Sequence, residues 1–337
     1  MDNQRIRFLD VAKGLGIILV LLGHTYEVPG NVHLLIYAFH MPMFFVLSGY
    51  VYNTKKYINY SPQNYLRLVA KRYLYYYCFF VIINIILEIV WKFNQIGSIS
   101  ELGANLVKWI LASLYCYPYM DYMPNCSPIW FLLCLFWAEM IVWGIYRYLN
   151  SKTWCFVFAI FISSILSYTI DFQLPLEIAP AFMASAYMFL GIKIREYGII
   201  DWILKKKIIL VFILMIGGIA AAMNVDVTMA ANDYGNVFLF LLSSCCLSVS
   251  IICSCVILSN MFECRLLSFL GRNTVILIGL NYFLRNLSIE IYYIVPYLKN
   301  IQITWKWNFA FTVMLSLLVC MLWSKRKKLR LFAYLCI

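Results

Sequence analysis

Long apolar runs follow one another along almost the whole chain, separated by short polar segments. Ten of them reach the ~20 residues that an α-helix needs to cross a bilayer. The pattern predicts an all-α fold, a polytopic transmembrane helical bundle that forms one membrane domain over residues 1–337. A shorter amphipathic segment, Asn105–Tyr119, is expected to lie at the membrane surface. The predicted spans are 8–27, 33–52, 73–92, 128–149, 153–171, 178–195, 207–224, 236–258, 273–293 and 307–324.

The polar segments between the runs alternate in charge. Basic residues cluster before the first span, between the second and third, between the sixth and seventh, and after the last. The alternate segments hold the acidic residues Glu101, Asp121, Asp171, Glu177, Asp226 and Asp233. Because Lys and Arg accumulate on the cytoplasmic side of membrane proteins, this alternation places both termini in the cytoplasm and requires an even number of spans.

Composition agrees with a lipid environment. Hydrophobic residues make up 64% of the chain and charged residues 12%, against roughly 25% charged residues in soluble domains. The net charge of +12 does not indicate nucleic-acid binding, because the basic residues fall in short clusters between apolar runs. The twelve cysteines show no spacing typical of a metal site, so no metal is expected. A multi-pass protein of the plasma or inner membrane is expected.

The first run, RIRFLDVAKGLGIILVLLGHT, carries ionisable residues on one helix face. Lys13 and His24 are eleven residues apart, which places them within about 20° of each other and ~16 Å apart along the axis. Asp10 lies one turn before Lys13 on the same stripe. Such residues are costly in lipid, so this face is predicted to line a packed interior or a wet cavity.

The second run carries His40 two residues before Pro42, so a titratable ring lies beside an interrupted hydrogen-bond ladder. His33 shares the helix face of His40, and we expect it to be a structural histidine bonded to a neighbouring carbonyl. Ser48 follows toward the cytoplasm and is a candidate for substrate binding. His24 and His40 lie on consecutive helices and are predicted to be functional.

Short motifs in these two runs carry a family resemblance. Residues 9–14, 23–24, 39–45 and 48–50 read LDVAKG, GH, FHMPMFF and SGY. This pattern resembles the acyltransferase-3 family of integral membrane O-acyltransferases, with the fucose 4-O-acetylase-like branch the most similar. The family's first-helix motif is a basic residue, ten intervening positions and a histidine, which corresponds here to Lys13 and His24.

The resemblance continues further along the chain. It includes the basic cluster at 67–77, the Ile-Trp-Phe-Leu segment at 129–132 and the Leu-Gly-Arg-Asn-Thr segment at 270–274. Two departures stand out. Asn281 occupies a position where relatives often have a histidine, and Tyr76-Tyr77 replaces the usual Pro-Tyr.

The resemblance implies transfer of an acetyl or other acyl group from acyl-CoA to a hydroxyl of a cell-surface polysaccharide or lipid-linked sugar. A general base with a pKa near 7 accelerates such a reaction by ~10²–10⁴, and an imidazole titrates at ~6.5, so His24 fits this role. Lys13 or His40 would stabilise the developing oxyanion. An acetyl-His intermediate is an alternative route. The expected donor is acetyl-CoA, and no metal is needed.

Other polar residues are candidates for substrate binding. Arg67, Lys71 and Arg72 lie on the predicted cytoplasmic side, where they would bind the phosphates of the donor. Clusters of this kind also arise from topology alone, and for Arg72 the two interpretations are equally weighted. Trp130 is a candidate for stacking on a sugar. Glu139 is an intramembrane carboxylate, functional by default or else a partner for Lys or Arg.

The alternative function is a transporter or flippase of lipid-linked sugars or polysaccharide. Such a protein would be expected to show two related halves with paired broken helices. The sequence has no internal symmetry of this kind, which favours the enzyme. Membrane lipid and a glycan or lipid-linked sugar acceptor are the expected partners.

Overall fold

A computed structural model of the chain describes residues 7–92, 98–117, 122–125, 127–150, 152–170, 172–294 and 304–328. Helices dominate these regions, and an isolated bridge joins Thr228 to Asp233. The α-helices are α1 Arg7–Gly23, α2 Gly30–Tyr37, α3 His40–Val51, α4 Thr54–Tyr57, α5 Pro62–Trp91, α6 Ile99–Tyr115, α7 Trp130–Tyr148, α8 Thr153–Thr169, α9 Ile178–Glu196, α10 Ile199–Lys205, α11 Lys207–Met223, α12 Val237–Met261, α13 Arg265–Arg272, α14 Thr274–Ile294 and α15 Trp305–Lys328. Short 3₁₀ helices cover Ser127–Ile129, Pro175–Glu177 and Met229–Ala231.

The prediction of an all-α polytopic membrane bundle is confirmed. In the described residues, seven helices are long and apolar enough to cross a membrane, when α2 and α3 (Gly30–Val51) are counted together as one. The count becomes eight if α10 and α11, which meet at a bend of 109°, form one span. Helices α1 and α8 contain 17 residues each, which gives ~26 Å of length against a hydrocarbon core of about 30 Å. The count of ten spans and the sides of the termini stay predictions.

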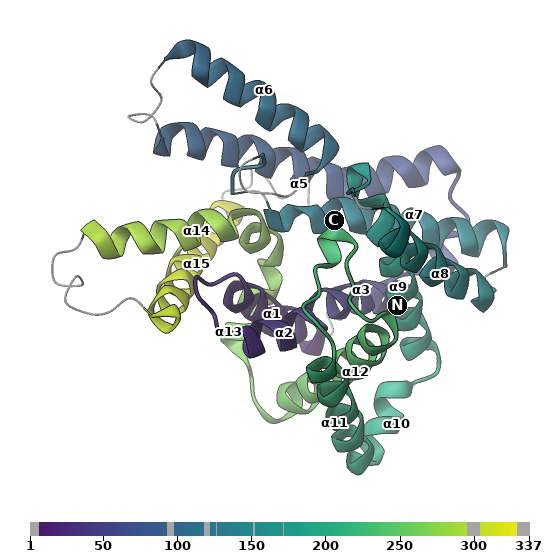
Figure 1. Cartoon of the computed structure of the whole chain (residues 1–337). Helices are drawn as coiled ribbons and strands as arrows, with labels where there is room; N and C mark the ends of the chain where they lie inside the picture. Colours follow the sequence, from purple (N-terminus) through teal and green to yellow (C-terminus); the bar gives the residue numbers. More distant parts are fainter. Residues whose placement is uncertain are drawn as a thin grey trace.

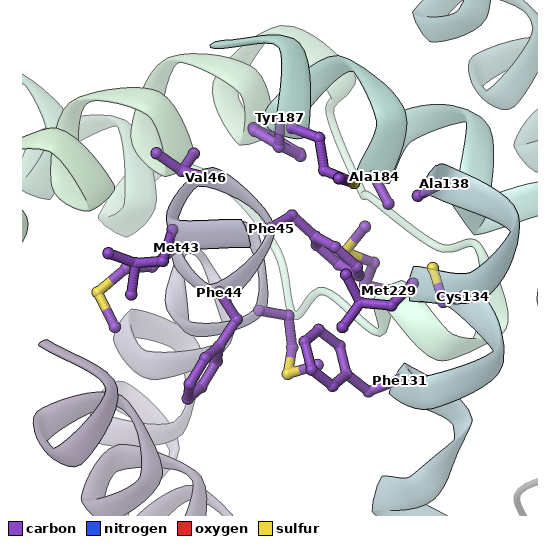
Figure 2. Close-up of a cluster of buried hydrophobic side chains, with 14 of the residues drawn as sticks. Met43, Phe44, Phe45, Val46, Phe131, Cys134, Ala138, Ala184, Tyr187 and Met229 are labelled. Atoms are coloured by element: carbon purple, nitrogen blue, oxygen red, sulfur yellow. The ribbon is translucent and has the colours of Figure 1, made fainter. Parts of the chain in front are cut away.

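The three helices formed by the first two apolar runs, α1 to α3, lie in the middle of the bundle, with α5 and α6, α14 and α15, and α10 to α12 around them (Figure 1). Helix α3 packs on α9, α1 packs on α13, and α7 contacts both α5 and α9. Side chains of α3, α7 and α9 form the buried core shown in Figure 2, including Phe45, Phe131 and Tyr187.

Glycines allow α3 and α9 to approach backbone to backbone. A Cβ added to Gly49 would lie 1.9 Å from the carbonyl oxygen of Met188, and one added to Gly191 would lie 2.0 Å from that of Val46. Small residues at such crossings are typical of helix packing in membranes. The crossing fixes α3, and with it the residues FHMPMFF and SGY of the second apolar run, against the core of the bundle.

The second predicted span is a broken helix. Helix α2 ends at Tyr37, and α3 begins at His40 after Phe39, whose φ of −146° is not helical. Pro42 lies in the first turn of α3. Backbone N–H groups there have no partner within the helix, so proline costs no helical hydrogen bond at this position. The break therefore comes just before His40 and directs its ring, with that of Tyr37, into the interior.

The amphipathic segment forms α6, which begins at Ile99, six residues before the predicted start. Ser98 accepts a hydrogen bond from the backbone N–H of Glu101, an N-cap that the periodicity of apolar residues does not reveal. Cys116 adopts a left-handed conformation at the end of the helix. The last predicted residues, 118 and 119, lie outside the described residues.

Candidate functional site

Two of the cavities that the described residues enclose are lined by motif residues. We call the first, of about 320 Å³, the histidine cavity, because His24, His33 and His40 line it with Tyr37, Trp130 and Tyr282. We call the second, of about 480 Å³, the arginine cavity, because Arg72 and Arg272 line it with Asp10, Lys13, Ser48 and Glu139. Both volumes fall within the range of ligand-binding cavities.

The hydrogen bonds of His24 determine its tautomer. Nδ1 lies 2.8 Å from the carbonyl oxygen of Val20, which can only accept, so Nδ1 carries the proton in the neutral ring. Nε2 then keeps its lone pair, and the hydroxyl of Tyr37 lies 3.3 Å from it as a donor. The ring therefore presents a basic nitrogen on the side of the histidine cavity.

Tyr37 is surrounded by all three histidines. Its ring stacks on His33 with centroids 3.8 Å apart and meets the edge of His40 at 4.9 Å. Nδ1 of His40 lies 2.8 Å from the carbonyl oxygen of Ile36, so His40 has the same tautomer as His24. Within the described residues, His33 does not bond a carbonyl as expected; its Nδ1 instead lies 3.6 Å from a carboxylate oxygen of Asp226.

The end of α1 is held by α14. Nη1 of Arg285 lies 3.4 Å from the carbonyl oxygen of His24, where a cation complements the negative end of the helix dipole. The guanidinium also lies 4.4 Å above the ring of Tyr282, and that ring meets His24 edge-on at 5.3 Å. Arg285 and Tyr282 therefore position the imidazole from the α14 side.

An ion pair between α5 and α7 dominates the arginine cavity. Glu139 accepts hydrogen bonds from Arg72 and, at 2.7 Å, from the hydroxyl of Tyr73. Nη2 of Arg72 donates to the hydroxyl of Tyr57 at 3.1 Å. Of the two roles expected for Glu139, the structure shows the pairing with a basic residue, Arg72. Both residues of the pair line the cavity.

The Leu-Gly-Arg-Asn-Thr segment packs against the first motif. A Cβ on Gly271 would lie 1.9 Å from the carbonyl oxygen of Asp10, and one on Gly14 would lie 2.0 Å from that of Leu267. This contact brings the exposed Arg272 to the arginine cavity beside Asp10 and Lys13. The two sequence motifs thus form one wall of the cavity, although they lie at opposite ends of the chain.

The predicted site residues are divided between the cavities. His24, His40 and Trp130 line the histidine cavity, and Asp10, Lys13, Ser48, Arg72 and Glu139 line the arginine cavity. Arg67 and Lys71 are exposed on α5 and line neither, so their role in donor binding stays a prediction. Asn281 is fully buried on α14, and both polar atoms of its side chain lack a hydrogen-bond partner within the described residues.

Sequence reasoning missed several lining residues. Tyr37 is four residues after His33 and three before His40, so helical spacing would have placed it with them. Arg272 belongs to a quoted motif but was not assigned a role. Gln173 and Thr228, which also line the histidine cavity, lie in loops that no periodicity marks.

One comparison with known proteins is informative. Residues 6–325 match a family profile described as an acyltransferase domain. No curated protein and no solved structure matches the chain.

Proposed function

The chain belongs to the acyltransferase 3 family and is a multi-pass membrane acyltransferase, and on this basis we propose that it acetylates a sugar hydroxyl. The donor in this proposal is acetyl-CoA. The acceptor is a cell-surface polysaccharide or a lipid-linked sugar, as in the fucose 4-O-acetylase-like branch, and the membrane is the plasma or inner membrane. The family assignment favours an enzyme over the transporter alternative.

The single observation that carries the proposal is the basic Nε2 of His24 at the histidine cavity. In the proposed step, Nε2 takes the proton of the acceptor hydroxyl as its oxygen attacks the thioester carbonyl. The C–S bond then breaks, and the CoA sulfur leaves with the electron pair and receives the proton. The same lone pair would also serve the alternative route through an acetyl-His24 intermediate.

Tyr37 is better suited than His40 to donate a hydrogen bond to the oxyanion. A neutral His40 has its proton on Nδ1, bonded to Ile36, and has none left to donate from Nε2. The Tyr37 hydroxyl donates to His24 in the resting site and becomes available once the acceptor hydroxyl takes its place. Lys13 lines the other cavity.

The lining of the histidine cavity supports a neutral sugar as acceptor. Trp130, Tyr37 and Tyr282 offer aromatic faces, and Gln173 and Thr228 offer uncharged hydrogen-bonding groups. The arginine cavity supports the donor, because the basic residues Lys13, Arg72 and Arg272 outnumber the acidic Asp10 and Glu139 in its lining and leave a net positive charge for the CoA phosphates. The topology predicted from the basic loops puts the arginine cavity on the cytoplasmic side, where acetyl-CoA is found.

The test compares surface glycans of cells that express the wild-type protein, His24→Gln or no protein, by mass spectrometry for added acetyl groups. His24→Gln keeps a hydrogen-bonding group but cannot transfer a proton, so acetylation should fall ~100-fold or more. Thr25→Val is the matched control, because Thr25 is buried next to His24 and lines neither cavity. Near-normal acetylation by His24→Gln at equal protein levels would make His24 structural and move the search to His40.

A further inference from the structure

The boundary between the two cavities falls at one residue of α14. Ile278 lines both cavities, and no other described residue does. One turn earlier, Val275 lines the arginine cavity, and one turn later, Tyr282 lines the histidine cavity. Helix α14 therefore passes from one cavity to the other at Ile278, a residue that is 3% exposed.

Helices α3 and α7 change cavities at the same level. On α3, Met41 lines the histidine cavity and Phe44 the arginine cavity, and three residues of helix rise only ~4.5 Å. On α7, the change occurs between Trp130 and Phe131. The partition between the cavities is therefore about one layer of side chains thick.

That layer is apolar. The ring centroids of Phe44 and Phe131 lie 5.7 Å apart. Figure 2 shows that the two side chains come from different helices, α3 and α7. Both are buried, as is Ile278. None of the three side chains offers a partner to a phosphate or a sugar hydroxyl, so polar parts of donor and acceptor are excluded from this level.

This arrangement constrains the reaction proposed above. The basic residues that suit the CoA phosphates lie on one side of the layer, and Nε2 of His24 lies on the other. For an acceptor oxygen activated by His24 to bond to the acyl carbon as the C–S bond breaks, the acyl end of a donor held in the arginine cavity must pass through the layer. The acyl group is then a part of the donor that has to pass Ile278, Phe44 and Phe131.

We propose that Ile278, with Phe44 and Phe131, forms a gate between the two cavities and determines the size of the acyl group that is transferred. The inference rests on the proposed function. Ile278 is β-branched and held in a packed helix, so it has few alternative rotamers with which to admit a larger group. The gate therefore favours acetyl over longer acyl chains.

The experiment uses membrane vesicles with the cytoplasmic side outward, prepared from cells that make their own surface glycans and supplied with labelled acetyl-CoA or hexanoyl-CoA. The readout is label in the glycan fraction, together with CoA binding by the purified protein in detergent. Ile278→Ala should raise the ratio of hexanoyl to acetyl transfer ~10-fold or more, since a few methylenes in an apolar site discriminate at this level. Ile276→Ala is the matched control, because Ile276 is a buried isoleucine of α14 that lines neither cavity.

Ile278→Phe tests the gate in the other direction. The larger phenylalanine side chain should close the gate, so transfer of both acyl groups should fall at least ~10-fold while CoA binding is retained. An equal ratio in Ile278→Ala and Ile276→Ala, or normal transfer by Ile278→Phe, would overturn the gate alone. A wild-type protein that binds acetyl-CoA but labels no glycan would overturn both the gate and the proposed function.

Discussion

Nη1 of Arg72 lies 2.8 Å and 2.9 Å from the two carboxylate oxygens of Glu139, and this ion pair joins α5 to α7 at the wall of the arginine cavity. The side chain of Glu139 is 4% exposed and that of Arg72 is 36% exposed. Removing the arginine would leave a buried carboxylate without its cation, which costs more than the pair itself contributes. The pair therefore has a structural role besides any contact with the donor.

Arg72→Ala should lower the free energy of unfolding by about 2 kcal/mol, below the ~3–5 kcal/mol of a fully buried pair because Arg72 is partly exposed. In Arg72→Ala/Glu139→Gln much of this loss should return, since no orphaned charge remains. Thermal unfolding in detergent measures both. Equal melting temperatures for the single and double variants would contradict the structural role.

Arg272→Ala should raise the apparent KM for acetyl-CoA by ~10-fold with a smaller effect on kcat, because an exposed guanidinium lining the arginine cavity contributes binding rather than chemistry. Steady-state kinetics with varied acetyl-CoA provide the measurement. Arg265→Ala is the control, since Arg265 begins the same helix and lines neither cavity. If the two variants have the same KM, Arg272 does not bind the donor.

Tyr37→Phe should lower kcat by ~10-fold or more and leave the KM for acetyl-CoA unchanged. The substitution keeps the ring that stacks on His33 but removes the hydroxyl that lies 3.3 Å from Nε2 of His24. Tyr197→Phe, at an exposed tyrosine outside both cavities, serves as control. Full activity of Tyr37→Phe at normal protein levels would exclude the hydroxyl from the reaction.

Gly271→Ala should destabilise the protein by ~1–3 kcal/mol, because its Cβ would lie 1.9 Å from the backbone oxygen of Asp10 and α13 would have to move away from α1. Gly144→Ala in α7 is the matched control. A Cβ at Gly144 meets nothing within 4 Å, so alanine should be neutral or stabilise by ~0.4–1 kcal/mol. Thermal unfolding of the two variants decides, and equal melting temperatures would rule out the close contact.

A reporter active only in the cytoplasm should give signal when fused to Ile337 and none when inserted after Asp121. The expectation follows from the alternation of basic and acidic loops along the chain. Reporter activity in intact cells measures it, with immunoblots to confirm equal expression. The reverse pattern would exchange the sides assigned to donor and acceptor.

The sequence by itself determined the all-α membrane bundle and the position of most of its helices. An apolar run of span length can be recognised from the local sequence. Because lipid offers no hydrogen bonds, the backbone N–H and C=O groups of such a run are satisfied within a helix. Helical spacing likewise predicted that His24 and Lys13 line interior space, since a charged stripe is costly against lipid. The motifs of the first two runs indicated the acyltransferase 3 family, which the match over residues 6–325 confirmed.

Only the tertiary structure decided how these residues are divided. Lys13 and His24 lie on one stripe of one helix, yet they line different cavities, because the side chains of α3, α7 and α14 close the space between them. The pairing of Arg72 with Glu139 joins positions far apart in the chain, and Ile278 is an ordinary isoleucine of an apolar run. Periodicity records which face of a helix is buried, whereas contacts between helices depend on packing that no local pattern encodes.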